Sequence, residues 1–128
     1  RAHFSGNRGL FQGGSITARL FSHVTMDGAL SMHDNHAELG GWLYVWMGCT
    51  ISVRGHTRVS ESSARDWGGA SFFAHHSVGE FEHTEFIDCW ADFAAGVIFP
   101  LGPEVTLRFG EGVEFIRGRA SYVGGLHL

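Results

Sequence analysis

The sequence repeats one motif five times at a nearly constant spacing. Each copy opens with an apolar residue, has a small or polar residue three positions later, and ends with a glycine pair or its equivalent. The opening residues follow one another at intervals of 28, 27, 27 and 29 positions: Phe4, Met32, Val59, Phe86 and Phe115. A period of this size that covers the whole chain predicts a solenoid of stacked coils rather than one globular core.

Short strands are expected to fill the residues between the glycine pairs. Apolar residues alternate with other residues, as at Val24 and Met26, and glycine interrupts each run, which indicates strands and turns. A further strand is expected after each glycine pair, at residues 15–18, 42–46, 70–74, 97–99 and 126–128. The sequence therefore predicts an all-β fold, a right-handed single-stranded parallel β-helix of about five coils of 27–29 residues. It forms a single domain over residues 1–128.

The glycine pairs mark a corner that recurs in every coil. Such a corner needs a backbone with positive φ or a close approach of neighbouring coils, and glycine allows both without steric cost. The second glycine is present in all five copies, so we expect a row formed by Gly14, Gly41, Gly69, Gly96 and Gly125. Asn7 and Asn35 occupy the third position after the opening residue in adjacent coils. Their amides are expected to stack as a short hydrogen-bonded ladder in the turn.

Large aromatic residues gather on the strand that follows the glycine pair. Trp42, Tyr44 and Trp46 are expected to share one side of their strand, with Phe72 and Phe99 stacked beyond Tyr44 in the next coils. An exposed apolar surface of this size usually marks an interface or a ligand-binding face. Three interpretations are open: contact with a protein partner, stacking on sugar rings, or cover by a neighbouring segment of the chain such as residues 100–103.

Composition excludes several classes of protein. Charged residues form 17% of the chain and the formal net charge is −4, so the chain lacks the basic stripe that holds a nucleic acid. The longest apolar stretches, residues 42–47 and 94–101, are too short for a membrane-spanning helix. Cys49 and Cys89 occupy different positions of the repeat, which favours buried free thiols over a disulfide. The motifs reach almost to both termini without a capping element, and we expect the chain to be a segment of a longer repeat protein.

The paired motifs resemble those of a known family. FSGN precedes GGSI within residues 4–16, MHDN precedes GGWL within residues 32–43, and FIDC precedes AGVI within residues 86–98. These pairs are similar to the FxxN and GGA(I/L/V) repeats of the polymorphic outer membrane protein family. The resemblance implies a right-handed parallel β-helix that is exposed on the cell surface and acts as an adhesin.

Two columns of polar residues are candidates for chemistry because the members of each column share one position of the repeat. Asp34, Glu61 and Asp88 lie one coil apart, near the separation of a retaining glycosidase pair, and could also bind calcium. His56 and His83 form a column of two imidazoles, which lacks the fixed third ligand of a zinc site. We interpret both columns as solvated surface residues, and we expect no cofactor, metal or catalytic site.

The sequence thus favours a non-catalytic module for adhesion or binding that is extracellular or lies at the cell surface. Its expected partner is a protein or a glycan, or a neighbouring β-helix segment, and neither nucleic-acid binding nor a membrane-spanning segment is expected. Two alternatives are open. One is an enzyme similar to the β-helix polysaccharide lyases and hydrolases, and the other is a structural spacer or assembly subunit whose open coils present unpaired strand edges.

Overall fold

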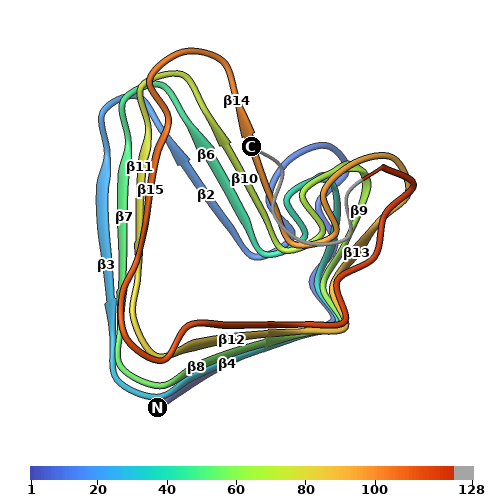
Figure 1. Cartoon of the computed structure of the whole chain (residues 1–128), viewed down its shortest axis with the longest axis horizontal. Coiled ribbons are helices and arrows are strands. Elements are labelled where there is room, and N and C mark those ends of the chain that lie inside the picture. Colours follow the sequence, from blue (N-terminus) through green and yellow to red (C-terminus); the bar gives the residue numbers. More distant parts are fainter. Residues whose placement is uncertain (123–128) are drawn as a thin grey trace.

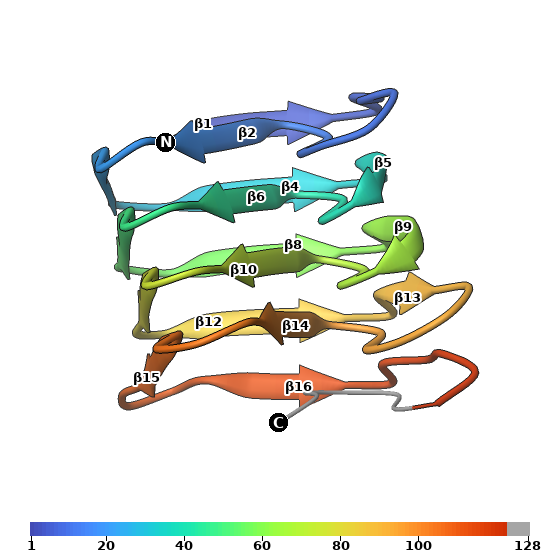
Figure 2. The same cartoon turned by 90° about the horizontal axis from the view of Figure 1, so that it is seen from above.

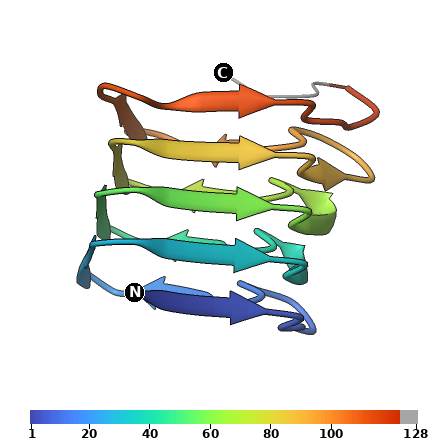
Figure 3. The ribbon, with the colours of Figure 1, turned by 90° about the horizontal axis from the view of Figure 1, so that it is seen from below.

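Stacked parallel strands make up the fold of the described residues. The computed structural model describes residues 1–122, in which every regular element is a β-strand. All strand pairs are parallel, and Met32 pairs with Phe4 on one side and with Val59 on the other. These partners are the opening residues of successive motifs, so the repeat period sets the register of the sheet. The coils lie above one another as a β-solenoid (Figure 2, Figure 3). The predicted all-β parallel architecture is confirmed, and its right-handed sense stays a prediction.

Within residues 1–122, equivalent strands of successive coils form four sheets. The leading sheet contains the opening residues: β1 (Ala2–Ser5), β4 (Leu30–His33), β8 (Thr57–Ser60), β12 (Thr84–Ile87) and β16 (Glu114–Ile116). The short sheet follows it in the three middle coils: β5 (His36–Leu39), β9 (Ser63–Trp67) and β13 (Trp90–Ala91). The post-glycine sheet comes next: β2 (Ile16–Arg19), β6 (Leu43–Trp46), β10 (Ser71–Ala74) and β14 (Ile98–Leu101). The side sheet closes the coil: β3 (His23–Asp27), β7 (Thr50–Arg54), β11 (Val78–Phe81) and β15 (Thr106–Phe109).

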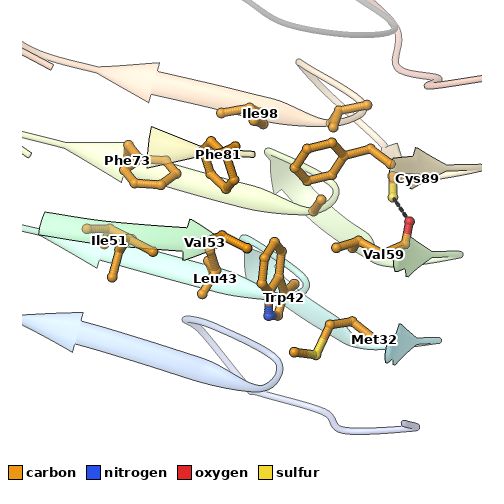
Figure 4. Packing of buried hydrophobic residues seen from close by; sticks show 14 of the residues in the cluster. Met32, Trp42, Leu43, Ile51, Val53, Val59, Phe73, Phe81, Cys89 and Ile98 are labelled. Atoms are coloured by element: carbon orange, nitrogen blue, oxygen red, sulfur yellow. Dashed lines mark hydrogen bonds between the residues drawn. The ribbon is translucent and has the colours of Figure 1, made fainter. Parts of the chain in front are cut away.

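The leading, post-glycine and side sheets enclose a triangular cross-section that contains the main core (Figure 1). The alternating apolar residues of these strands point into it, and Met32, Val53 and Phe73 are fully buried there (Figure 4). Cys49 and Cys89 are buried free thiols, as the sequence predicts. Burial raises the pKa of Cys89 to about 12, so this thiol is unreactive near neutral pH.

The short sheet is a fourth strand position that the sequence did not predict. Residues that follow the leading sheet leave the triangle and run beside the post-glycine sheet (Figure 1). Leu39 and Trp67 of the short sheet pack with Tyr44 and Phe72 of the post-glycine sheet in a second apolar cluster. The post-glycine strands are apolar on both faces, and a strand of this kind must be covered on both sides.

The second glycines of the pairs lie in a row, as predicted. The Gly41 amide donates a hydrogen bond to the Gly69 carbonyl oxygen at 3.2 Å. A Cβ atom at Gly14 would overlap the carbonyl oxygen of Gly41, and a Cβ atom at Gly69 would overlap that of Gly96. Neighbouring coils therefore approach too closely at this corner for any side chain. Gly125, the fifth member of the predicted row, lies outside the described residues.

The first residue of each pair supplies the backbone angle of the corner. Gly13, Gly40 and Gly68 have φ angles of 52°, 63° and 66°, in the left-handed region that favours glycine. Ala95 adopts the same conformation in the fourth repeat with a φ of 54°, which costs roughly 1 to 2 kcal/mol for a residue with a side chain. The corner thus uses one glycine for its angle and the other for the close contact between coils.

The predicted ladder of Asn7 and Asn35 is present. Asn7 Nδ2 donates to Asn35 Oδ1 at 2.9 Å, and Asn35 Nδ2 donates to the Phe4 carbonyl oxygen at 3.2 Å. Because Asn35 is fully buried, these bonds satisfy an amide that has no access to water. Ser62 occupies this position in the third coil, and its buried hydroxyl has no hydrogen-bond partner within the described residues. The ladder therefore ends after two rungs.

Candidate functional site

Most of the predicted aromatic face is covered by the protein itself. Tyr44, Phe72 and Phe99 stack along the outer face of the post-glycine sheet, with successive ring centroids 5.4 and 6.0 Å apart. The ring of Trp67 on β9 lies against Phe72 and Phe99 at centroid distances of 6.0 and 5.3 Å. Phe72 is consequently only 1% exposed. The prediction that these three rings form an open binding face is wrong, because the short sheet covers them. Leu39 of β5 and Trp67 of β9 provide the cover from the short sheet, and Leu101, within residues 100–103, also packs against the cluster.

Trp46 is the member of this face that stays half-buried. Its ring stacks on Tyr44 with the centroids 6.0 Å apart, and the guanidinium of Arg19 lies 5.8 Å from the centre of the Tyr44 ring. A shallow groove of about 300 Å³ follows these side chains, with Gln12 and Leu20 completing its lining. Contact of Trp46 with a partner therefore stays a prediction.

The prediction that Trp42 shares a side with Tyr44 is wrong. Trp42 points into the main core, is fully buried, and lies against Phe86 with ring centroids 6.2 Å apart (Figure 4). The cause is a bulge at the corner, where the amides of Trp42 and Leu43 both donate to the Ala70 carbonyl oxygen, at 2.7 and 3.0 Å. Two consecutive residues then occupy one step of the strand pairing, so the alternation shifts and both side chains point inward.

The predicted acidic column forms one wall of a groove at the corner between the leading sheet and the short sheet. The groove has a volume of about 380 Å³ and is lined by Asp34, Glu61, Asp88, Trp90 and Arg119. Each acid directly follows a strand of the leading sheet and has a left-handed backbone, with φ angles of 51°, 53° and 52°. The three carboxylates therefore recur at the spacing between coils, about 4.8 Å.

Asp88 is held in its ionised form by an arginine of the next coil. Arg117 Nε donates to Asp88 Oδ1 at 2.6 Å, and Arg117 Nη2 donates to Asp88 Oδ2 at 2.7 Å. These two hydrogen bonds keep the pKa of Asp88 below its ordinary value, and the charge of Arg119 acts in the same direction. No ion pair among residues 1–122 includes Asp34 or Glu61. The groove thus contains three carboxylates that can accept hydrogen bonds, and Arg117 neutralises the charge of Asp88.

Trp90 is the large apolar side chain of this groove, and sequence reasoning missed it. It occupies β13, is 38% exposed, and belongs to a column in which Ser63 pairs with His36 on one side and with Trp90 on the other. The rings of His36 and Trp90 lie two coils apart in the chain, yet their centroids are only 6.2 Å apart. The two rings therefore lean toward each other across Ser63, whose hydroxyl bonds His36 Nδ1 at 2.7 Å.

A second groove adjoins the first and shares two of its residues. It has a volume of about 460 Å³ and is lined by Trp90, Ala91, Asp92, Arg119, Ala120 and Ser121. Trp90 and Arg119 separate the two hollows, so both hollows belong to one continuous surface. We call the residues that line the two grooves the corner surface. The repeat alignment contains one signal for Trp90, because it is the one large aromatic residue that lies four positions after the opening residue of a motif.

The predicted histidine column lies elsewhere, in the turns that directly precede the strands β8 and β12 of the leading sheet. The rings of His56 and His83 are 5.5 Å apart between centroids and line a groove of about 250 Å³ with Arg58 and Glu85. Within residues 1–122, no group of three or more His, Cys, Asp or Glu side chains is arranged to bind a metal ion.

Comparison with family models, with curated proteins and with solved structures finds no match to this chain. In the part of the chain that the structure describes, no helix has the length and apolar character needed to cross a membrane. The inference of function therefore starts from the corner surface, where a half-exposed aromatic ring, three carboxylates and an arginine meet.

Proposed function

We propose that the chain is a non-catalytic binding module that contacts its partner through the corner surface. The observation that carries this proposal is Trp90, a tryptophan that is 38% exposed between two grooves. Tryptophan is among the residues most enriched at the energetic centres of interfaces. Tryptophan combines an apolar ring with a polar N–H group and is enriched at interfaces where one end of the side chain is apolar and the other is wet.

The contrast with Trp42 and Trp67 supports a functional interpretation of Trp90. Trp42 is fully buried in the main core, and Trp67 covers the aromatic stack on the post-glycine sheet. Both rings contribute to the fold by burying apolar surface. Trp90 belongs to neither apolar cluster, and its ring contact is a tilted one with His36. The fold does not depend on a large ring at this position, so binding is the better account of it.

The charge state of Asp88 suits hydrogen-bond acceptance and does not suit the acid of a glycosidase pair. A retaining glycosidase needs one carboxyl group that stays protonated near neutral pH so that it can donate a proton to the leaving group. Arg117 moves the pKa of Asp88 in the opposite direction. An ionised carboxylate accepts hydrogen bonds well, which suits the recognition of hydroxyl or amide groups on a partner.

The repeat motifs support a place for this module at the cell surface or outside the cell. Their similarity to the repeats of the polymorphic outer membrane protein family suggests an adhesin that binds a protein or a glycan. A purely structural spacer is less well supported, since it has no need for a half-exposed tryptophan in a groove.

The proposal predicts that Trp90→Ala abolishes adhesion while a matched change elsewhere does not. Beads coated with the wild-type chain are expected to attach to a panel of cultured cells, and Trp90→Ala is expected to reduce attachment roughly tenfold or more. Phe21→Ala is the control, because Phe21 is an aromatic residue of the first coil that is 78% exposed and lines neither groove.

Two results would contradict the proposal. The first is equal attachment of the wild type and the Trp90→Ala variant in every cell type that binds the beads. The second is cleavage of a soluble polysaccharide by the wild-type chain that is lost in Asp88→Asn, which would support the enzyme alternative instead.

A further inference from the structure

We propose that the corner surface binds a neutral oligosaccharide of β-1,4-linked hexose rings, with the sugar chain running across the coils along the solenoid axis. This inference rests on the proposed function and names the chemical class of its ligand. Three features carry it: the apolar character of Trp90, the polar character of the remaining lining, and the regular spacing of that lining along the axis.

The corner surface combines one flat apolar group with a polar border. Trp90 is the only large apolar side chain among the residues that line the two grooves, since the other apolar lining residues are Ala91 and Ala120. A hexose ring has the complementary form, with a face of C–H groups and an edge of hydroxyl groups. Stacking of that face on the exposed part of the indole would remove apolar surface from water on both partners.

The carboxylates of the corner surface are placed to accept hydrogen bonds from sugar hydroxyls. Asp34, Glu61 and Asp88 belong to three successive coils and repeat at about 4.8 Å along the axis. One ring of an extended β-1,4-linked chain advances by a similar distance, so consecutive rings can meet consecutive coils. Arg119 borders both grooves and can donate hydrogen bonds to ring or hydroxyl oxygens at the end of the row.

The same features favour a sugar chain over a peptide. An extended peptide gains affinity by pairing with an open strand edge, but β9 lies between β5 and β13, and the backbone of Arg119 hydrogen-bonds the other edge of β13 beside these grooves. A protein partner also places apolar anchors in deep apolar pockets, and the corner surface provides a single ring in a shallow hollow. Sugar chains need neither feature, because their recognition depends on stacking and on many hydroxyl contacts.

The charges of the corner surface select neutral sugars over acidic ones. Arg117 already neutralises Asp88, which leaves Asp34 and Glu61 without an ion pair in residues 1–122. A uronic acid chain would bring a carboxylate on every ring toward these two acids, and like charges at such distances disfavour binding. Arg119 is the one cation among the lining residues that could offset this repulsion.

Titration calorimetry with defined hexamers tests the inference. The probes are β-1,4-linked hexamers of glucose, N-acetylglucosamine and mannose, together with the glucose hexamer oxidised at C6 so that each ring carries a carboxylate. We expect at least one neutral hexamer to bind the wild type and the oxidised hexamer to bind at least about tenfold more weakly. Trp90→Ala is expected to weaken neutral binding about tenfold or more. Trp90→Phe should retain part of it, and Phe21→Ala should leave it unchanged.

The outcomes separate this inference from the proposed function. If no neutral hexamer binds, or if the oxidised hexamer binds more tightly, the ligand class is overturned. If bead attachment to cells still depends on Trp90 in that case, the corner surface is a binding site for a different partner and the proposed function stands. If both calorimetry and attachment are insensitive to Trp90→Ala, the proposed function fails as well.

Discussion

Gly69→Ala is expected to destabilise the protein by about 4 kcal/mol or to prevent it from folding, a loss at the upper end of single substitutions. The added Cβ would overlap the carbonyl oxygens of Gly96 and Trp90, which are backbone atoms of the next coil. Backbone atoms cannot rotate away as a side chain can, so the two coils would have to separate at the corner. Chemical denaturation in urea, followed by far-ultraviolet circular dichroism, measures the loss.

Gly28→Ala is the matched control for this prediction. Gly28 also lies in a turn and has a φ of 92°, but no atom lies within 4 Å of its added Cβ. Alanine at this position is expected to lower the free energy of unfolding only through its strained backbone conformation, by roughly 1 to 2 kcal/mol. Equal losses in Gly69→Ala and Gly28→Ala would show that close contact between coils is not what requires glycine at the corner.

Trp42→Ala is the second change with a large expected effect, about 3 to 5 kcal/mol of unfolding free energy. Trp42 is fully buried between the coils of the main core, where it contacts Phe86. Removal of the indole would leave a cavity that the rigid strand ladders around it cannot close. Urea unfolding measures the loss: the midpoint concentration should fall while the slope of the free energy of unfolding against urea concentration stays the same.

Trp90→Ala provides the comparison, because it removes the same side chain from a half-exposed position. It is expected to lower the free energy of unfolding by at most about 1 kcal/mol while it weakens binding about tenfold or more. The pair therefore separates stability from function: Trp42→Ala should lower stability, and Trp90→Ala should lower affinity. A larger loss of stability in Trp90→Ala than in Trp42→Ala would contradict the placement of both residues.

The register of the coils could be predicted from the sequence because it follows from the motif period alone. Met32 pairs with Phe4 and Val59, Gly41 contacts Gly69, and Asn7 contacts Asn35, each at the offset that the repeats give. The repeat period therefore gives the residues that lie above and below a given residue, even where the other contacts of that residue are unknown. This is why the acidic column and the histidine column were also placed together correctly.

The direction of a side chain could not be predicted in the same way. The bulge at Trp42 and Leu43 depends on a shared carbonyl oxygen, and strand alternation carries no signal for it. The covering of Phe72 depends on Trp67, whose segment forms a fourth strand that the alternating pattern did not reveal. Simple alternation therefore assigned Trp42 to the wrong face and left the stack of Tyr44, Phe72 and Phe99 exposed.

Only part of the candidate site could be predicted from the sequence. The acids Asp34, Glu61 and Asp88 were found because they share a column, while Trp90 and Arg119 belong to a column with His36 and Ser63. The residues of this second column differ in chemistry and form no repeating pattern, so the sequence alone does not mark the column as a site. The groove exists because the chain turns between the leading and short sheets, which places the two columns side by side.

Disulfide cross-linking tests most directly the claim that equivalent residues of successive repeats lie one above another. Ser31 and Arg58 are register partners on β4 and β8, at a separation of about 4.8 Å that a disulfide can span. His33 lies diagonally from Arg58, at roughly 7 to 8 Å, which is too far. Under mild oxidation, Ser31→Cys with Arg58→Cys should therefore cross-link nearly completely, while His33→Cys with Arg58→Cys should not. Equal cross-linking of the two pairs, or preferential cross-linking of the diagonal pair, would contradict the register and with it the corner surface.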